Sequence, residues 1–216
     1  MDFANLVIPA LLNGAKFTVT IAIQAGILAI LISIVVGVLR QFNNLLLKIF
    51  TTCYVEFFRG TSAFVQIYWA YFALPMIGVK LSAIEAGILV LALNVGAYGS
   101  EVVRGALKAI PKGQIEACKS LGIPNLIIYW KVLLPQAMTR IILPMGNLMI
   151  DLLKGTSLLS AITVTDLAFA GRQLISSFGN PLLIFGLVLI IYLILALPLS
   201  LGSKFLYQRL CYWKSY

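Results

Sequence analysis

The sequence contains no histidine and only three cysteines. Ser-His and Cys-His nucleophilic catalysis is therefore excluded, because both need an imidazole as the general base. The cysteines, Cys53, Cys118 and Cys211, are too far apart to form a CxxC pair. Without histidine beside them, a zinc or haem site is not expected. The residue inventory thus predicts no metal site and does not favour an enzyme.

Charged residues are also scarce, at 11% of 216 residues, whereas a soluble domain has about 25%. Hydrophobic residues make up 61% of the chain, and the mean hydropathy is +1.02. A chain this apolar needs lipid as its solvent. At about 20 residues per spanning helix, the length allows roughly five or six crossings. We expect an all-α membrane protein that forms a single domain over residues 1–216.

Five long apolar runs stand out along the chain. They predict spanning helices over residues 17–39, 61–79, 82–103, 137–161 and 182–202. A polar stretch over residues 105–136 separates the third helix from the fourth, and residues 162–180 form an interrupted segment. No cleavable signal peptide is expected, because the start of the chain has no basic region and the first apolar run is too long.

Basic residues exceed acidic ones by 16 to 7, which in a membrane protein is first a signal of topology. With five helices, and with Lys154 assigned to a helix, twelve basic residues, Arg59 among them, lie on one side. Only Lys16, Lys80 and Arg172 lie on the other. Because short cytoplasmic loops collect positive charge, we expect the N-terminus outside and the C-terminus in the cytoplasm. The polar stretch is then cytoplasmic too, and the charge does not indicate a nucleic-acid partner.

Small residues recur at every fourth position of two predicted helices. They are Ala25, Ala29, Ser33 and Gly37 in the first helix, and Ala92, Gly96 and Ser100 in the third. Such stripes let helix backbones approach closely in a membrane. The pattern favours packing within the chain over a dimer interface.

The polar stretch reads as two short helices joined by a turn. Pro111 suits the start of a helix over residues 114–121, and Gly122 can adopt the left-handed conformation that ends it. Pro124 prevents continuation. A second short helix over residues 125–134 follows, with apolar residues at helical spacing. We expect a compact paddle outside the bilayer.

The same stretch resembles the EAA loop of bacterial ABC importer permeases. Glu116-Ala117-Cys118, then Gly122, then Val132-Leu133-Leu134-Pro135 meet the spacing of that loop at every step. Cys118 and Val132 depart from its usual Ala and Ile. The resemblance implies the fold of a type I ABC importer transmembrane domain, with five helices. It also implies an ATPase-coupling loop that contains Glu116, Ala117, Gly122, Leu134 and Pro135.

Further segments resemble one subgroup, the permeases for polar amino acids of the histidine, glutamine, glutamate, arginine and opine type. Ser62 stands where the subgroup has Pro, and Gly155 stands where an acid is usual. The resemblance covers roughly residues 17–203. The residues that carry it are Phe57 to Thr61, Val65 to Ile67, Asn94, Ala97, Tyr98, Glu101, Arg104, Gly105, Leu133 to Ala137, Leu143, Pro144, Asn147 and Leu153 to Leu158.

This family resemblance implies a division of labour in a bacterial inner membrane. The permease pairs with a second permease chain, identical or not. A cytoplasmic ATPase binds ATP and Mg, and an extracytoplasmic binding protein delivers the amino acid. The sequence supports one part independently, because it has no Gly-Lys-Ser/Thr phosphate loop, so no cofactor is expected in this chain. The alternative is an ion-coupled secondary carrier or channel, although no inverted repeat is visible.

Asp151 is the leading candidate for a substrate contact. It lies about 16 Å beyond Arg140 along the fourth helix, near the middle of the bilayer, where an ionisable group is costly. Asn147, one turn earlier, shares its face. The pair could hold an ammonium group or a cationic side chain of the substrate. Alternatively, Asp151 forms a neutralising pair with Lys154.

Four other polar residues remain open between functional and structural roles. Asn94 and Tyr98, one turn apart on the third helix, could face the same cavity or form helix-to-helix hydrogen bonds. Glu101 and Arg104 predict a structural ion pair or an inner gate at the cytoplasmic end. Arg59 and Lys154 are expected to be anchors or gate elements.

Overall fold

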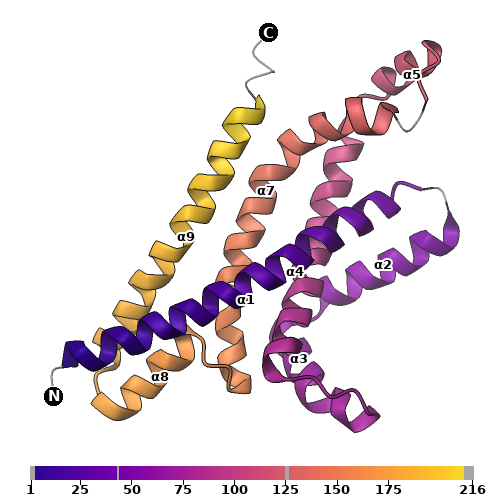
Figure 1. Ribbon diagram of the computed structural model, residues 1–216. Coiled ribbons are helices and arrows are strands. Elements are labelled where there is room, and N and C mark those ends of the chain that lie inside the picture. The colour runs from indigo at the N-terminus through magenta and orange to yellow at the C-terminus, as the bar shows by residue number, and fades with distance from the viewer. Residues whose placement is uncertain (1–2, 43, 125–126, 212–216) are drawn as a thin grey trace.

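The computed structural model describes residues 3–42, 44–124 and 127–211, and all regular structure within them is helical. Figure 1 shows long helices that cross one another, with α5 and the end of α9 at one end of the bundle and α8 at the other. We refer to these as the α5 end and the α8 end. The main helices are α1 (Phe3–Leu39), α2 (Leu45–Gly60), α3 (Ala63–Tyr68), α4 (Ala83–Lys108), α5 (Lys112–Ser120), α7 (Leu134–Gly155), α8 (Leu167–Phe178) and α9 (Pro181–Cys211).

Helix α1 begins at Phe3, well before the predicted start at residue 17. Its N-terminal part is apolar, and Pro9 does not interrupt it. Val7 and Leu11 are buried there in a cluster with Leu167 of α8 and Ile184 of α9. The helix is longer than predicted because this first part packs against α8 and α9.

The second predicted span is a short helix continued by two irregular turns, with a helix before it that was not predicted. Helix α2 precedes it, capped by Asn44, whose Oδ1 accepts from the backbone N–H of Leu46 at 3.0 Å. After a break, α3 continues as a π-helical turn, η1 (Trp69–Ala73), and a 3₁₀ turn, η2 (Leu74–Ile77). The sequence prediction omitted α2, because Lys48, Glu56 and Arg59 interrupt its apolar pattern. This segment ends at Gly78, which has a φ of 92°.

Helices α1 and α4 pack closely through their small residues, which confirms the predicted packing within the chain. The hydroxyl of Ser33 lies 3.3 Å from the carbonyl oxygen of Gly96. A Cβ added at Gly99 would lie 2.1 Å from the Ser33 Oγ, and one at Gly37 would lie 2.6 Å from the Cβ of Val103. Only glycine fits at these two positions without a shift.

The paddle differs from its prediction in its second half. Helix α5 spans Lys112–Ser120, but the residues after the turn form a π-helical segment, η3 (Ile128–Leu133), that runs directly into α7. Pro135 lies in the first turn of α7. Because proline lacks the N–H that an α-helix needs and its ring crowds the preceding turn, the wider π turn lets the helix continue past it. Residues 125 and 126, where the second short helix was predicted to begin, lie outside the described residues.

The interrupted segment after α7 is an ordered bend that leads into a helix. A 3₁₀ turn, η4 (Thr156–Ile162), ends at Thr163, and α8 then runs at 50° to the preceding helix. Asp166 is fully buried, and its carboxylate caps α8 by accepting from the N–H of Phe169 at 2.9 Å. Thr18 of α1 accepts from the N–H of Leu167 at 3.1 Å. A buried helix start must satisfy its N–H groups in this way.

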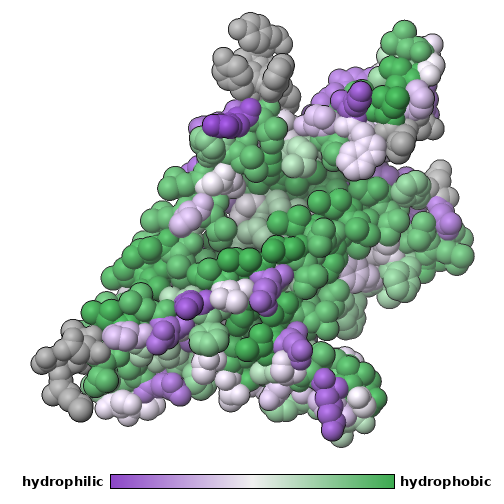
Figure 2. All heavy atoms as spheres, in the orientation of Figure 1, coloured by the Kyte–Doolittle hydropathy of each residue, from purple (hydrophilic) through white to green (hydrophobic). Residues whose placement is uncertain are grey.

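Three helices, α1, α4 and α9, are long and apolar enough to cross a membrane within the described residues. The bent pair of η3–α7–η4 with α8 passes the same test of length and composition when its two parts are taken together, and the shorter apolar stretch Ala63–Ile77 lies at the second predicted span. The outer surface is mostly hydrophobic (Figure 2), as a lipid-facing surface requires. This all-helical arrangement agrees with the predicted fold class.

Candidate coupling segment and translocation face

The candidate coupling segment consists of the short helix α5 and the ordered turn at Gly122. It lies at the α5 end of the bundle. After α5, Gly122 adopts a φ of 71°. Its N–H donates to the carbonyl of Lys119 at 2.9 Å, and the N–H of Ile123 donates to that of Cys118 at 3.1 Å. These bonds satisfy the last carbonyls of α5 in a left-handed helix stop. The turn assigned to Gly122 from the sequence is thus formed.

Two faces of α5 differ in exposure. Ile115 and Cys118 are partly buried against a cluster that includes Ile110 and Ile128. The opposite face exposes Glu116 and Ala117, and Leu121, just after the helix, is 78% exposed. Glu116, Ala117 and Leu121 on this face are therefore accessible to a partner protein. Glu116 has no ion pair among the described residues.

Leu134 and Pro135 lie at the start of α7 rather than on the exposed face of α5. Leu134 is half-buried and Pro135 is exposed. The structure therefore separates the five predicted coupling residues into an exposed group on α5, a turn at Gly122 and a support at the base of α7. The guanidinium of Arg140 joins this base to the end of α4, because its Nη1 donates to the carbonyl of Ala109 at 2.8 Å.

Helix α7 exposes one polar stripe along its length. Arg140, Pro144, Asn147, Asp151 and Lys154 are all exposed, at spacings of three or four residues. Such spacing places them on one face. A stripe with ionisable groups in a spanning helix faces either a water-filled path or another protein chain, because exposure to lipid is costly.

Asp151 and Lys154 form the predicted pair, but loosely. The Nζ of Lys154 lies 3.8 Å from Oδ1 of Asp151, beyond hydrogen-bonding distance. Both side chains stay more than half exposed, at 68% for Asp151 and 62% for Lys154. The pairing thus leaves the carboxylate accessible, so the neutralising pair and a substrate contact are compatible.

Asn94 belongs to a different part of the molecule, the break between α2 and α3. Its Nδ2 donates to the carbonyl of Phe58 at 2.8 Å and to Oε1 of Gln66 at 3.2 Å. Gln66 in turn donates to the hydroxyl of Thr61 at 2.6 Å and to the carbonyl of Phe58 at 3.1 Å. Broken helices inside a membrane need such partners for their free carbonyls. These contacts favour the structural alternative for Asn94.

Tyr98 and Arg59 lie together near the same break. The Tyr98 hydroxyl donates to the carbonyl of Arg59 at 3.4 Å, and the Arg59 guanidinium lies 5.3 Å from the centre of the Tyr98 ring. Within the described residues, no hydrogen bond or ion pair joins Asn94 or Tyr98 to the polar stripe of α7. The four predicted substrate contacts are therefore divided between two places.

Arg59 lies inside the bundle at the end of α2, whereas the sequence prediction counted it with the basic residues of the cytoplasmic side. It ends α2, which enters the bundle from the α5 end, and it stacks on Tyr98 ten residues before the end of α4. Its charge is favourable at the C-terminus of α2, where the helix dipole is negative. Without Arg59, and with Lys214 outside the described residues, ten of the basic residues counted on that side remain.

Glu101 and Arg104 form an ion pair, as predicted, and a third residue joins them. Oε1 of Glu101 pairs with Arg40 at the end of α1, and Oε2 accepts from Nε of Arg104 at 2.9 Å. Gln41 adds a bond from its Nε2 to the carbonyl of Arg104 at 3.3 Å. We call Arg40, Glu101 and Arg104 the charge cluster. Sequence reasoning missed Arg40, because the two helices had to be placed side by side to find it.

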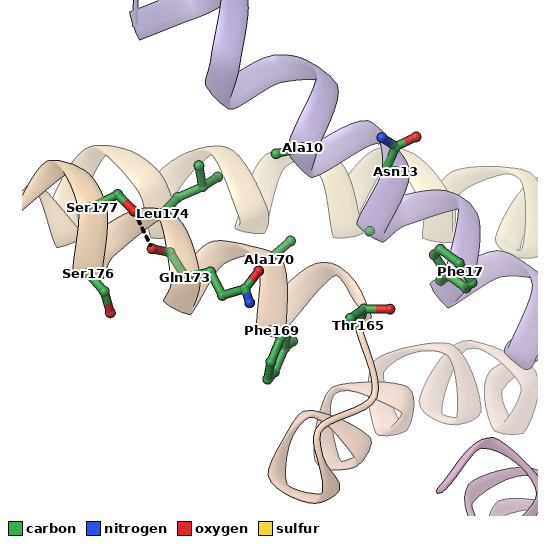
Figure 3. Close-up of a pocket in the computed structure, with 11 residues that line it drawn as sticks. Ala10, Asn13, Phe17, Thr165, Phe169, Ala170, Gln173, Leu174, Ser176 and Ser177 are labelled. Carbon is green, nitrogen blue, oxygen red and sulfur yellow. Dashed lines mark hydrogen bonds between the residues drawn. The ribbon is translucent and has the colours of Figure 1, made fainter. Parts of the chain in front are cut away.

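A pocket of about 570 Å³ lies between α1 and α8 at the α8 end. Figure 3 shows Asn13 of α1 and Gln173, Ser176 and Ser177 of α8 around it. The hydroxyl of Ser177 donates to the carbonyl of Gln173 at 3.2 Å. The sequence analysis did not predict this pocket, because it treated residues 162–180 only as an interrupted segment. The pocket is a concave surface with both polar and apolar residues, at the end of the bundle opposite α5.

Comparison with known proteins places this architecture in one family. The family described as "Binding-protein-dependent transport system inner membrane component" matches residues 29–210. The chain is 36% identical to a probable amino-acid ABC transporter permease protein, y4tF, of Sinorhizobium fredii, over 94% of the chain and 88% of that protein. It is 34% identical to the glutamine transport system permease protein GlnP of Escherichia coli K12, over 94% of each.

Solved structures agree with the sequence matches. A crystal structure of an amino acid ABC transporter with histidines superimposes with a TM-score of 0.87 at 27% identity, over 97% of this chain and 99% of that one. The MetNI methionine ABC transporter, in an inward-facing conformation, shares the fold with a TM-score of 0.82 at 22% identity, over 97% and 99%. These matches support a permease and not a secondary carrier. The chain belongs to the family of binding-protein-dependent transport system inner membrane components and is a multi-pass permease subunit of an ABC importer.

Proposed function

We propose that this permease carries polar amino acids into the cell. The observation that carries the proposal is the exposed stripe of α7, where Asn147 and Asp151 are open to a ligand. A carboxylate can pair with the ammonium group of an amino acid, and the neighbouring amide can donate or accept a hydrogen bond. The relatives named for amino-acid and glutamine transport support the same substrate class.

The proposed energy source is a cytoplasmic ATPase that binds ATP and Mg. The exposed face of α5, with Glu116, Ala117 and Leu121, supports docking to such a partner. The sequence has no phosphate loop of its own, so ATP hydrolysis is assigned to the partner. Closure of the ATPase pair would move α5, and α7 would follow through η3 and the Arg140 contact to Ala109.

The proposed orientation puts the α5 end and the C-terminus in the cytoplasm and the N-terminus outside. Within the described residues, ten basic residues on the α5 side, against Lys16, Lys80 and Arg172 on the other, support this orientation. An extracytoplasmic binding protein would then approach the α8 end. The pocket beside Asn13 and Gln173 offers polar side chains to it.

A second permease chain, identical or not, is proposed to cover the polar stripe of α7. Two stripes facing each other would enclose a path away from lipid, which removes the cost of exposing Asp151 and Lys154 to the bilayer. In this arrangement Asp151 and Asn147 contact the substrate. Arg59, Lys154 and the Glu101–Arg104 pair act as anchors or gate elements.

The test uses the permease reconstituted with its ATPase and binding protein in lipid vesicles. Uptake of labelled basic, neutral and acidic amino acids is measured for wild type and for Asp151→Asn. We expect the variant to lose uptake of its preferred substrate. A parallel variant, Ala117→Cys in a chain whose native cysteines are replaced by serine, should form a cross-link to the ATPase. An unchanged substrate profile in Asp151→Asn would overturn the substrate contact, and a failure to cross-link would overturn the coupling assignment.

A further inference from the structure

An apolar groove of about 410 Å³ lies between α1, α7 and α9 in the half of the bundle nearer the α5 end. Figure 1 shows why it exists, since α1 and α9 are adjacent at the α8 end and diverge toward the α5 end. We call it the α1–α9 groove. Its walls include Ile34, Val38, Met138, Ile142, Leu199 and Leu206, and Val103 and Leu107 of α4 also line it.

Small residues give the groove its depth. Gly146 of α7 faces Ser203 of α9 so closely that an added Cβ would lie 2.5 Å from the Ser203 Cβ. Gly202 also lines the groove, and a Cβ there would have no atom within 4 Å. The helices thus touch at the floor while the space above it stays open. Its volume lies within the range of small-molecule sites, about 300–1,000 Å³.

The second permease chain does not account for this groove. Met145 lines the groove and lies two positions before Asn147 of the polar stripe. Side chains two positions apart in an α-helix point about 200° apart around the helix axis. Helix α7 therefore turns its polar stripe and its groove wall in opposite directions. A chain that covers Asp151 leaves the groove facing the bilayer. Its apolar walls fit a hydrocarbon chain and offer water almost no hydrogen-bonding partners.

Helical spacing places two basic residues beyond the groove residues, Arg209 on α9 and Lys131 on η3. Positions 199, 202 and 206 of α9 face the groove, and Arg209 is the next residue at that spacing. Arg209 is exposed and stacks on Phe205, with its guanidinium 5.0 Å from the ring centre. Lys131, also exposed, lies about one turn before the groove residue Leu134. An apolar groove with cations at one end matches a phospholipid that has an anionic headgroup.

We infer that the α1–α9 groove binds an anionic glycerophospholipid of the leaflet at the α5 end. One acyl chain lies along the apolar walls, and the phosphate meets Arg209 and Lys131. In the proposed orientation this is the cytoplasmic leaflet, whose anionic lipids attract basic residues near the surface. The inference concerns lipid and does not depend on which amino acid the importer carries.

The experiment measures lipids that stay bound to the purified permease–ATPase complex. The complex is exchanged into detergent with equimolar phosphatidylglycerol and phosphatidylcholine, and bound lipid is counted by native mass spectrometry. Wild type should retain phosphatidylglycerol. Arg209→Gln should retain about fivefold less, the factor expected for one basic residue near anionic lipid. Gly202→Phe, which fills the groove, should retain less still.

Two matched variants control for changes elsewhere on α9. Gly186→Phe adds the same ring at another glycine with no atom within 4 Å, outside the groove lining. Lys204→Gln removes an exposed cation that helical spacing places on the far side of α9 from the groove residues. Both should bind lipid as wild type does. Equal retention of the two lipids by wild type would overturn the inference. Equal phosphatidylglycerol retention by Gly202→Phe and Gly186→Phe would overturn it too, as would dissociation of the two permease chains caused by Gly202→Phe alone.

Discussion

The amide nitrogen of Asn94 in α4 lies 2.8 Å from the carbonyl oxygen of Phe58 at the end of α2. This bond, with those from Gln66, satisfies a helix end that is broken within the apolar part of the bundle. The segments Phe57 to Thr61 and Val65 to Gln66, which carry part of the family resemblance, thus have a structural role. They let the chain break between α2 and α3 without leaving free carbonyls in lipid.

Replacing Asn94 by leucine should destabilise the permease. The substitution keeps the side-chain size but removes the donor, so the carbonyl of Phe58 keeps only Gln66 and the free energy of unfolding falls by about 1–3 kcal/mol. Thermal unfolding of the purified protein in detergent measures the effect. Tyr98→Phe, which loses only a hydrogen bond of 3.4 Å, is the control and should unfold near wild type. A stable Asn94→Leu protein with altered substrate selectivity would instead assign Asn94 to the substrate path.

Gly122→Ala should uncouple transport from ATP hydrolysis, and Gly113→Ala should not. An added Cβ meets no atom within 4 Å at either position, so the two variants differ in backbone conformation alone. Gly122 has a φ of 71°, where alanine costs about 1–2 kcal/mol, whereas Gly113 lies in α5. The measurement is amino-acid uptake per ATP hydrolysed by the reconstituted transporter. Equal coupling ratios in both variants would show that the turn does not transmit motion.

Glu101→Gln should destabilise the α5 end of the bundle. The change leaves Arg40 and Arg104 side by side without the carboxylate that both contact. Removing one partner of a largely buried ion pair lowers the free energy of unfolding by about 3 kcal/mol. Arg40→Gln should cost less, because Arg104 still pairs with Glu101. Melting temperatures in detergent give the order, and a Glu101→Gln protein as stable as wild type would mean that the charge cluster contributes nothing to the fold.

Gly37→Ala tests the close packing of α1 on α4. The new Cβ would lie 2.6 Å from the Cβ of Val103, so the helices must separate, at about 1–3 kcal/mol. Gly105→Ala adds a Cβ where no atom lies within 4 Å and should leave stability unchanged or raise it slightly. Detergent-solubilised protein is compared by thermal unfolding. The prediction fails where the two variants unfold alike.

Much of the architecture was predictable from the sequence because apolar runs and small-residue stripes report directly on lipid exposure and helix contact. The stripe that contains Ser33 and Gly37 predicted close helix packing within the chain, and the positive φ of Gly122 was expected from its place in the loop. Features that depend on three-dimensional contacts were missed. The N-terminal extension of α1 exists because α8 and α9 pack on it. The capping role of Asp166 depends on the backbone N–H of Phe169 beside its carboxylate, which the sequence alone does not reveal.

The candidate site residues were likewise predictable only where helical spacing alone determines their position. The sequence could place Asn147 and Asp151 on one face by helical spacing, and the structure has both exposed on α7. It could not place Asn94 and Tyr98 on that path or away from it, since this depends on how α2 and α3 fold back on α4. Arg40, Arg209 and the residues of the α1–α9 groove carry no motif and became candidates only from their neighbours.

The most direct test determines the energy source and the substrate of the permease in one experiment. The permease is reconstituted with its ATPase and binding protein, ATP is supplied inside or outside the vesicles, and uptake of labelled polar amino acids is followed without an ion gradient. We expect uptake that requires ATP on the side of α5, the binding protein on the side of α8, and the carboxylate of Asp151. Uptake by the permease alone, driven by a proton or sodium gradient and indifferent to ATP, would contradict this expectation.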